Sequence, residues 1–323
     1  MLLKFINSNR LSLIVFITLL PVLYWVPSFI TVGPVQTMQD PGVPLGKLIT
    51  QFNSNFRLLA SICALLFLLG NSYLLIQMNT NYIFIPVRTQ LPALFYLLLS
   101  TGITQLHQLT PALVSSTFLI LMFYRIFSAY KTEGVSMNFL DAGLLVSVAS
   151  LVYFPSIIFF FFLLASISLL RPFIWREWVF ALIGLLIPYL FLLSAVYIWD
   201  LSVADLVLQI SASFNGLNFT YKLSQIINWA IVLLFIIAGS YFIATYFDSM
   251  KIHARKFFLV FWVFFLFGLV VFLTFFKSGT GMVYFVSIPL AYLFSFYFVK
   301  CKANWINEIV FAMLLLLWIW QRI

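Results

Sequence analysis

Asp40 is the residue of this sequence whose type and setting best suit acid–base chemistry. It precedes Pro41 and Gly42, so the backbone around it is expected to be restrained, and it is the only acidic residue before Glu133. A carboxylate held in place can act as a general base toward a hydroxyl group. The same residues are also typical of an ordinary turn, in which an Asp side chain accepts hydrogen bonds from nearby backbone N–H groups. The sequence leaves both interpretations open.

Four other polar residues could bind a substrate beside this carboxylate: Lys47, Arg57, His107 and Lys222. The three cations among them are suited to a phosphate group. His107 has no His, Cys or carboxylate near it in the sequence, which is more typical of a solvated side chain than of a metal ligand. Cys63 and Cys301 form neither a disulfide framework nor a metal-ligand spacing. Because the chain has no HExxH, Walker, GxSxG or CxxC motif, we expect neither a metal nor a cofactor.

Asp141 is a charged residue two positions into an apolar run. A carboxylate within hydrocarbon is costly, and such residues are commonly functional. Alternatively, Asp141 lies in the first turn of a helix at the cytoplasmic interface, where a negative charge is favourable. In that interpretation Asn138 caps the helix.

Arg171, Arg176 and Glu177 make a compact polar turn between two apolar runs. Either arginine could bind a lipid phosphate through two hydrogen bonds. Alternatively, the turn anchors the next helix at the cytoplasmic surface, with an ordinary Arg–Glu ion pair. Together with Asp141, these residues are predicted to be cytoplasmic anchors or lipid contacts.

The composition is that of a membrane protein. Of the 323 residues, 64% are hydrophobic and 8% are charged, whereas soluble domains carry about a quarter charged residues. The apolar runs are continuous rather than alternating, which indicates helices and not a barrel. The net charge is +9, but no basic run with interleaved aromatic residues predicts binding to nucleic acid. The predicted fold is an all-α, polytopic, single transmembrane domain over residues 1–323, with the lipid bilayer as its partner.

The apolar runs predict about eleven membrane-spanning helices. The first follows Lys4 and Arg10 and lacks a small-residue cleavage site, which predicts an uncleaved signal anchor. Residues 27–57 and 200–225 are predicted to be longer loops. The span at 91–100 is the shortest, and the adjacent spans at 139–153 and 155–170 are each below the roughly 20 residues of a perpendicular helix. The others are 11–26, 58–78, 110–124, 178–199, 226–246, 257–276, 282–299 and 305–320.

The distribution of basic residues predicts the orientation. With a cytoplasmic N-terminus, most of the 17 Lys and Arg residues fall in cytoplasmic loops, as the positive-inside rule requires. This holds only if 139–153 and 155–170 cross separately. The C-terminus and both longer loops are then periplasmic, and the expected location is the bacterial cytoplasmic (inner) membrane.

The stretch from Asp141-Ala142-Gly143 to Tyr153-Phe154-Pro155 is similar to a glycine-bearing span and tight turn of the GT-C class of integral-membrane glycosyltransferases. The layout of roughly the first 225 residues resembles that class. The resemblance implies a polyprenyl-phosphate-linked sugar as donor, envelope glycan assembly as the process, and Asp40 as the base, with a divalent cation if the carboxylate acts through a metal. The chain departs from the class in its short first loop and in lacking an acidic pair at the end of the first span. It also resembles a bacterial family of polytopic inner-membrane proteins with an Arg-Pro-Phe-x-Trp-Arg-Glu turn, here at 171–177.

Two functions from other classes also fit this layout. A non-catalytic scaffold or partner in an envelope assembly or secretion complex would explain the scarcity of acidic residues. A transporter of small molecules or lipids is compatible with spans interrupted by Gly and Pro, although the chain has no clear inverted repeat and few charges within its spans. The sequence identifies neither a protein partner nor an oligomeric state.

Overall fold

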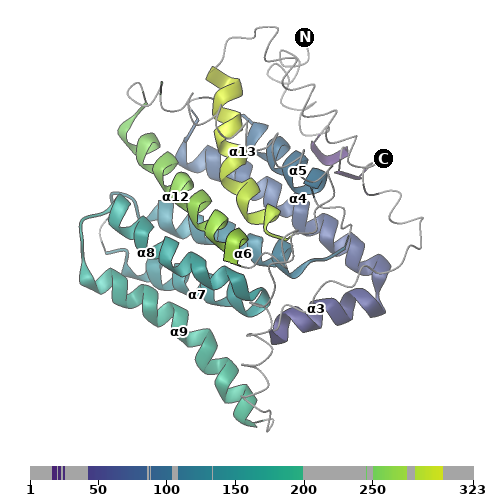
Figure 1. Ribbon diagram of the computed structural model, residues 1–323. Coiled ribbons are helices and arrows are strands. Elements are labelled where there is room, and N and C mark those ends of the chain that lie inside the picture. Colours follow the sequence, from purple (N-terminus) through teal and green to yellow (C-terminus); the bar gives the residue numbers. More distant parts are fainter. Residues whose placement is uncertain are drawn as a thin grey trace.

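The computed structural model describes residues 17–19, 21–22, 25, 43–85, 87, 89–103, 108–132, 134–198, 245, 250–274 and 281–300. Over these residues the fold is all-helical and has no strand, as predicted (Figure 1). The helices are α3 (Pro44–Asn55), α4 (Arg57–Tyr82), α5 (Leu91–Ile103), α6 (Pro111–Ser128), α7 (Ser136–Val152), the 3-10 helix η1 (Phe154–Ile158), α8 (Phe159–Leu170), α9 (Trp175–Ile198), α12 (Ile252–Thr274) and α13 (Val283–Lys300). The predicted spans at 11–26, 226–246 and 305–320 and the predicted loop at 200–225 lie wholly or largely outside the described residues.

Five of the described helices are long and apolar enough to cross a membrane, namely α4, α6, α9, α12 and α13. Helices α5, α7 and η1–α8 are apolar but shorter, as the sequence predicts for these three segments. The lengths and apolar composition of these helices are those of a multi-pass membrane protein. The total of about eleven spans stays a prediction.

Local sequence signals set the start of α6. Thr110 is its N-cap residue, and the Thr110 hydroxyl accepts a hydrogen bond from the backbone N–H of Leu113 at 3.0 Å. Pro111 occupies the first helical position, where its missing N–H costs nothing. This start is the one the Thr-Pro pair predicts.

A tight turn separates α7 from α8. Helix α7 ends at Val152, and Tyr153 has extended backbone angles (φ −143°, ψ 102°). Pro155 lies within the first turn of η1, which leads directly into α8. The break predicted at Tyr153-Phe154-Pro155 is therefore present.

The predicted first loop is partly helical. Residues Pro44–Asn55 form α3, with Pro44 at the N-terminal position, and α3 packs against α4, α6 and α7. The prediction of a loop over the whole of 27–57 was wrong for this part. Pro and Gly were interpreted as loop signals, but Pro at the first position of a helix is favourable.

One end of the bundle gathers the connection between α6 and α7, the connection between α8 and α9, and the start of α12. The Tyr130 ring after α6 contacts Phe257 of α12 at 5.1 Å between centroids. The Lys256 ammonium of α12 donates to the carbonyl oxygen of Leu170, at the end of α8, at 3.3 Å. The end of α4 lies there too, because the Tyr82 hydroxyl donates to the carbonyl oxygen of Tyr124 at 3.0 Å. We call this end of the bundle the basic end.

The opposite end gathers the other connections. Asn53 of α3 donates a hydrogen bond to the carbonyl oxygen of Leu109 at 2.6 Å. The hydroxyls of Ser115, in the first turns of α6, and Ser156 in η1 are 2.6 Å apart. The Tyr153 ring contacts Phe285 near the start of α13 at 5.8 Å. Since α7 leaves the basic end and α8 returns to it, these two short helices run in opposite directions.

Packed aromatic rings join α6, α12, α13 and the residues just after α4, toward the basic end of the bundle. The Phe261 and Tyr292 rings stack with centroids 4.6 Å apart, and Phe84 meets Phe127 edge to face at 5.1 Å. Each such pair is worth about 0.5–1.5 kcal/mol beyond its buried area. In lipid these contacts matter more than the hydrophobic effect, because a lipid tail is as apolar as a side chain.

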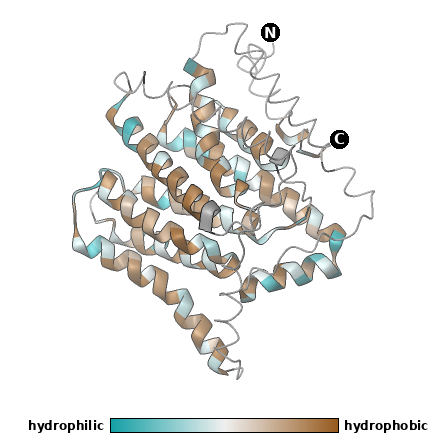
Figure 2. Ribbon diagram, viewed as in Figure 1, coloured by the Kyte–Doolittle hydropathy of each residue, from teal (hydrophilic) through white to brown (hydrophobic). Residues whose placement is uncertain are grey.

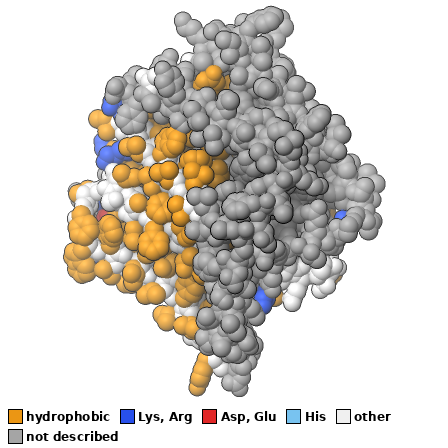
Figure 3. All heavy atoms as spheres, viewed as in Figure 1, with side chains coloured by type: hydrophobic (Ala, Val, Ile, Leu, Met, Phe, Trp, Pro, Cys, Tyr) orange, Lys and Arg blue, Asp and Glu red, His pale blue; other side chains and the backbone are white. Residues whose placement is uncertain are grey.

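The burial of the helices indicates which ones face lipid. In the most apolar stretch of each helix, 83% of the residues of α13 are buried inside the protein, whereas only 17% of those of α9 are. Figure 2 shows hydrophobic residues along the middle of the helices and hydrophilic ones near the starts of α9 and α12 and along α3. Figure 3 shows the outer surface over α8, α9 and α12 as largely hydrophobic. Helix α13 is therefore central, and α9 lies at the periphery.

Candidate functional site

Most of the described cations lie at the basic end. Among the described Lys and Arg residues, only Lys47 and Arg57 belong to helix ends on the opposite side. Those at the basic end are Arg125, Lys131, Arg171, Arg176, Lys251, Arg255, Lys256 and Lys300. This asymmetry matches the one that the predicted orientation needs.

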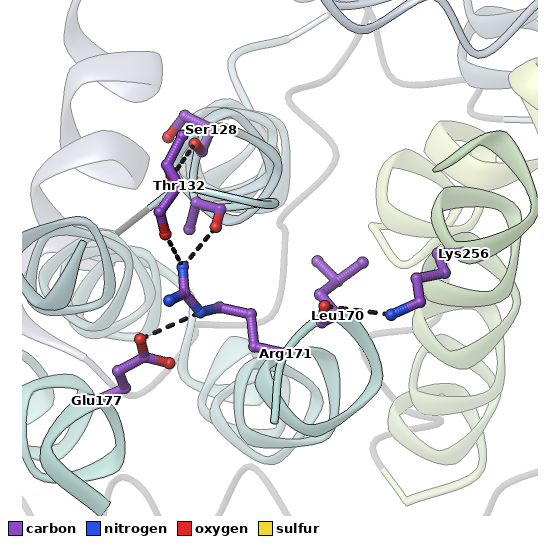
Figure 4. A network of polar contacts seen from close by, with 7 residues as sticks. Ser128, Thr132, Leu170, Arg171, Glu177 and Lys256 are labelled. Atoms are coloured by element: carbon purple, nitrogen blue, oxygen red, sulfur yellow. Dashed lines mark hydrogen bonds and ion pairs between the residues drawn. The ribbon is translucent and has the colours of Figure 1, made fainter. Parts of the chain in front are cut away.

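Arg171, in the connection between α8 and α9, binds the connection between α6 and α7 at the basic end (Figure 4). Its Nη1 donates hydrogen bonds to the carbonyl oxygens of Ala129, at 2.7 Å, and Thr132, at 2.6 Å. These carbonyls lie at and just beyond the end of α6, where the helix leaves its last C=O groups without internal partners. A guanidinium is suited to this position because it presents several fixed donors and favours the negative end of the helix dipole.

The same side chain also holds the start of α9. Arg171 Nε lies 3.1 Å from Glu177 Oε1, and the two side chains are only 11% and 3% exposed. Arg171 Nε and Glu177 Oε2 are buried and have no hydrogen-bond partner among the described residues. Removing one partner of such a pair leaves an uncompensated buried charge. The predicted Arg–Glu ion pair of this turn is therefore the one between Arg171 and Glu177. The other contacts of the Arg171 guanidinium are to backbone carbonyls of the protein.

Arg176 is placed differently from Arg171. It is exposed, and its guanidinium carbon lies 5.4 Å from the centroid of the Phe180 ring, one turn further along α9. A cation–π contact at an exposed site is worth about 0.5–1 kcal/mol. Of the two arginines of the turn, Arg176 is the one whose donors are open to the surroundings.

Asp141 pairs with a residue of the preceding helix. Its Oδ2 lies 3.3 Å from Arg125 Nε, and the two side chains are 38% and 51% exposed. Helix α7 begins at Ser136, so Asp141 lies beyond the first turn and Asn138 does not cap the helix. The Asn138 amide instead donates to the Ser128 hydroxyl at 3.1 Å. Asp141 thus bridges α6 and α7 at the basic end, and an exposed pair of this kind contributes about 0–1 kcal/mol.

A second polar cluster lies inside the bundle, and the sequence analysis missed it. The Asn71 amide nitrogen of α4 donates to the Tyr96 hydroxyl of α5 and to the Ser116 hydroxyl of α6, at 3.1 Å in each case. All three residues are fully buried, and Asn71 Oδ1 has no hydrogen-bond partner among the described residues. Polar residues that link helices inside a membrane protein replace hydrogen bonds that lipid cannot supply. The signal was present, because Asn71 interrupts a long apolar run.

The opposite end carries two further residues of the predicted site. Lys47 lies in α3 and Arg57 is the first residue of α4, so two of the predicted phosphate-binding cations share this end. Asp40, His107 and Lys222 lie outside the described residues. The segments that follow Asp40 and His107 are nevertheless linked, because Asn53 of α3 donates to the Leu109 carbonyl. Asn53 is buried, and its Oδ1 has no hydrogen-bond partner within the described chain.

The described residues hold no group of three or more His, Cys, Asp or Glu side chains that could bind a metal ion. The absence of a cofactor stays a prediction. The chain matches no protein-family model, no curated protein and no solved structure. The functional argument therefore rests on the residues themselves.

Proposed function

We propose that this chain is an integral protein of the bacterial cytoplasmic membrane that transfers a sugar from a polyprenyl-phosphate carrier during envelope glycan assembly. In this proposal the basic end faces the cytoplasm, and the chemistry takes place at the opposite, periplasmic end. Asp40 acts as the base, and Lys47 and Arg57 are available to the carrier phosphate. If Asp40 acts through a divalent cation, its carboxylate supplies one of the oxygen ligands that such hard cations prefer.

The observation that carries the proposal is the hydrogen bond between Asn53 and the Leu109 carbonyl, 2.6 Å long. It ties α3, which begins shortly after Asp40, to the residues that directly follow His107. Two chain segments that each lead away from a predicted site residue thus meet at one end of the bundle. The unpartnered Oδ1 of the buried Asn53 adds an acceptor there that could receive a substrate hydroxyl.

The proposed orientation is supported by the charge asymmetry. Residues in cytoplasmic loops carry an excess of Lys and Arg, and the described cations gather at the basic end. The helices that connect there alternate in direction, so the α3 end falls on the other side of the bilayer. A polyprenyl-linked sugar presented on that side would meet Lys47, Arg57 and the Asp40 segment.

The test is the composition of lipid-linked sugars in a strain that lacks the gene for this chain. We expect the deletion to accumulate a polyprenyl-phosphate sugar and to lose a glycan modification, both measured by mass spectrometry. Asp40→Asn keeps the size of the side chain and removes its charge, so it should reproduce the deletion while the protein level stays normal. Asp141→Asn, the same change at the basic end, should restore the wild-type composition.

Two results would contradict the proposal. If the deletion strain has normal lipid-linked sugars and glycans, the chain does not act in this process. If the deletion alters the glycans but Asp40→Asn restores them fully, the chain is needed for the assembly without being its catalyst. The second result would support a non-catalytic scaffold.

A further inference from the structure

Two lysines from distant parts of the chain converge on one aromatic ring at the basic end. The Lys131 ammonium lies 5.6 Å from the centroid of the Tyr130 ring, and the Lys256 ammonium lies 5.7 Å from the same centroid. The ring itself is held by Phe257, which contacts it edge to face at 5.1 Å. Both ammonium groups therefore lie beside the same ring, between the α6–α7 turn and the start of α12.

The backbone and the helix ends fix this arrangement. Lys131 has a positive φ of 59°, a conformation that is uncommon for residues other than glycine. The turn that contains it is held by Arg171, which donates to the carbonyl oxygens on both sides of Lys131, those of Ala129 and Thr132. Lys256 is oriented by its hydrogen bond to the Leu170 carbonyl (Figure 4).

The two ammonium groups keep donors for a ligand. An ammonium has three N–H donors, and Lys256 uses one of them on Leu170. The described acidic residues pair elsewhere, Asp141 with Arg125 and Glu177 with Arg171. Glu133, the nearest acidic residue in the sequence, lies outside the described residues. Two like charges held beside one ring repel each other, so an anion close to both would be bound favourably.

An apolar stripe leads away from Lys256 along α12. Leu259, Leu266 and Val270 follow Lys256 at helical spacing, so the four residues share one face of the helix. All three apolar side chains are exposed, and Figure 3 shows Lys and Arg side chains beside the hydrophobic surface at the start of α12. A ligand that fits here has an anionic head and an apolar tail.

We propose that Tyr130, Lys131 and Lys256 bind the phosphate headgroup of an anionic phospholipid, whose acyl chain lies along the exposed stripe of α12. The lysines donate charge-assisted hydrogen bonds to the phosphate oxygens, and the Tyr130 ring keeps both ammonium groups in place. A free phosphate would use only the head of this site and would leave the stripe without a role. The site lies at the end opposite the proposed transferase chemistry and does not depend on it.

The test uses the full chain purified in micelles that contain equal amounts of phosphatidylglycerol and phosphatidylcholine. Retained lipid is measured by native mass spectrometry. Lys131→Gln and Lys256→Gln should each weaken retention of phosphatidylglycerol by about fivefold, as expected for one basic residue near an anionic lipid. Tyr130→Phe keeps the ring and should retain the lipid. Phosphatidylcholine retention should not change in any variant.

Lys251→Gln is the matched control, because it removes the same charge from an exposed position at the same end. It should change retention less than twofold. Equal losses in Lys251→Gln and Lys256→Gln would overturn the site in favour of a general charge effect. Full competition by millimolar inorganic phosphate would overturn the assignment to a lipid. Thermal unfolding of each variant shows that it is folded, and Lys256→Arg, which keeps the charge, should keep most of the binding if Lys256→Gln fails to fold.

Discussion

Gly143 and Gly184 lie opposite each other where α7 crosses α9, and each fits against the backbone of the other helix. A methyl group on Gly143 would overlap the carbonyl oxygen of Ala181, and one on Gly184 would overlap the carbonyl oxygen of Leu140. Small residues let helix backbones approach closely, which is a main source of helix association in membranes. The peripheral helix α9 is therefore attached to the bundle chiefly through α7.

We predict that Gly143→Ala and Gly184→Ala each destabilise the protein. The added methyl group meets backbone atoms, which cannot rotate away, so the helices must separate at a cost of about 1–3 kcal/mol. The measurement is the midpoint of thermal unfolding of purified protein in detergent. Gly70→Ala in α4 is the control, because nothing lies within 4 Å of a methyl group there. An equal loss of stability in all three variants would contradict the close contact.

Arg171 and Arg176 are neighbours in sequence with opposite expected roles. Arg171→Ala removes the partner of the buried Glu177 and two hydrogen bonds to the α6–α7 turn, so we expect a loss of about 3 kcal/mol or more. Arg176→Ala removes an exposed side chain and should cost under about 1 kcal/mol. Unfolding midpoints and the yield of folded protein test the difference.

A second change separates the ion pair from the hydrogen bonds. Glu177→Gln in the Arg171→Ala background removes the uncompensated buried charge, so it should restore part of the lost stability. If Glu177→Gln makes Arg171→Ala less stable, the carboxylate is stabilised by something other than Arg171.

The Asn71 cluster should stabilise the contact between α4, α5 and α6. Asn71→Leu removes the two hydrogen bonds that the Asn71 amide donates to the hydroxyls of Tyr96 and Ser116. Hydrogen bonds between helices inside membranes average about 0.6 kcal/mol, so the coupling between Asn71→Leu and Tyr96→Phe in a double-mutant cycle should be close to that value. Additive losses would show that Asn71 acts through its shape and not through the Tyr96 hydroxyl.

The parts of the fold that depend on neighbouring residues in the chain could be predicted from the sequence. Thr110 and Pro111 give the start of α6 because a cap and a first-position proline act within one turn. The break at Tyr153-Phe154-Pro155 is likewise local. The helix α3 was missed because Pro44 and Gly46 in a polar stretch are as typical of a loop as of a helix start.

The parts that depend on distant residues could not be predicted. Arg171 binds the backbone carbonyls of Ala129 and Thr132. Because every residue has a backbone carbonyl, the sequence does not indicate which ones accept these hydrogen bonds. Gly143 was noted, but its counterpart Gly184 becomes apparent only when α7 and α9 are placed together. The convergence of Lys131 and Lys256 on Tyr130 likewise joins residues far apart in the chain, so composition could predict a basic end but not its geometry.

The direction of the helices across the membrane gives the last prediction. Phe173, between α8 and α9, and Lys251, before α12, lie at the basic end and are exposed, whereas the exposed Gln51 lies in α3 at the opposite end. Single cysteines at these positions, in a Cys63→Ser and Cys301→Ser background, report the side directly. Because basic ends face the cytoplasm, an impermeant maleimide should label Gln51→Cys in intact cells and should label Phe173→Cys and Lys251→Cys only after lysis.

Two patterns of labelling would contradict this arrangement, and each has a separate meaning. Labelling of Phe173→Cys and Lys251→Cys, but not of Gln51→Cys, in intact cells would invert the protein and place Lys47 and Arg57 in the cytoplasm. Labelling of Phe173→Cys together with Gln51→Cys would mean that α7 and α8 do not both cross. The second result would be at odds with the contacts of Leu170 and Lys256 at one end and of Ser115 and Ser156 at the other. Those contacts require α7 and α8 to run between the two ends, so we expect the three cysteines to divide between the two sides of the membrane.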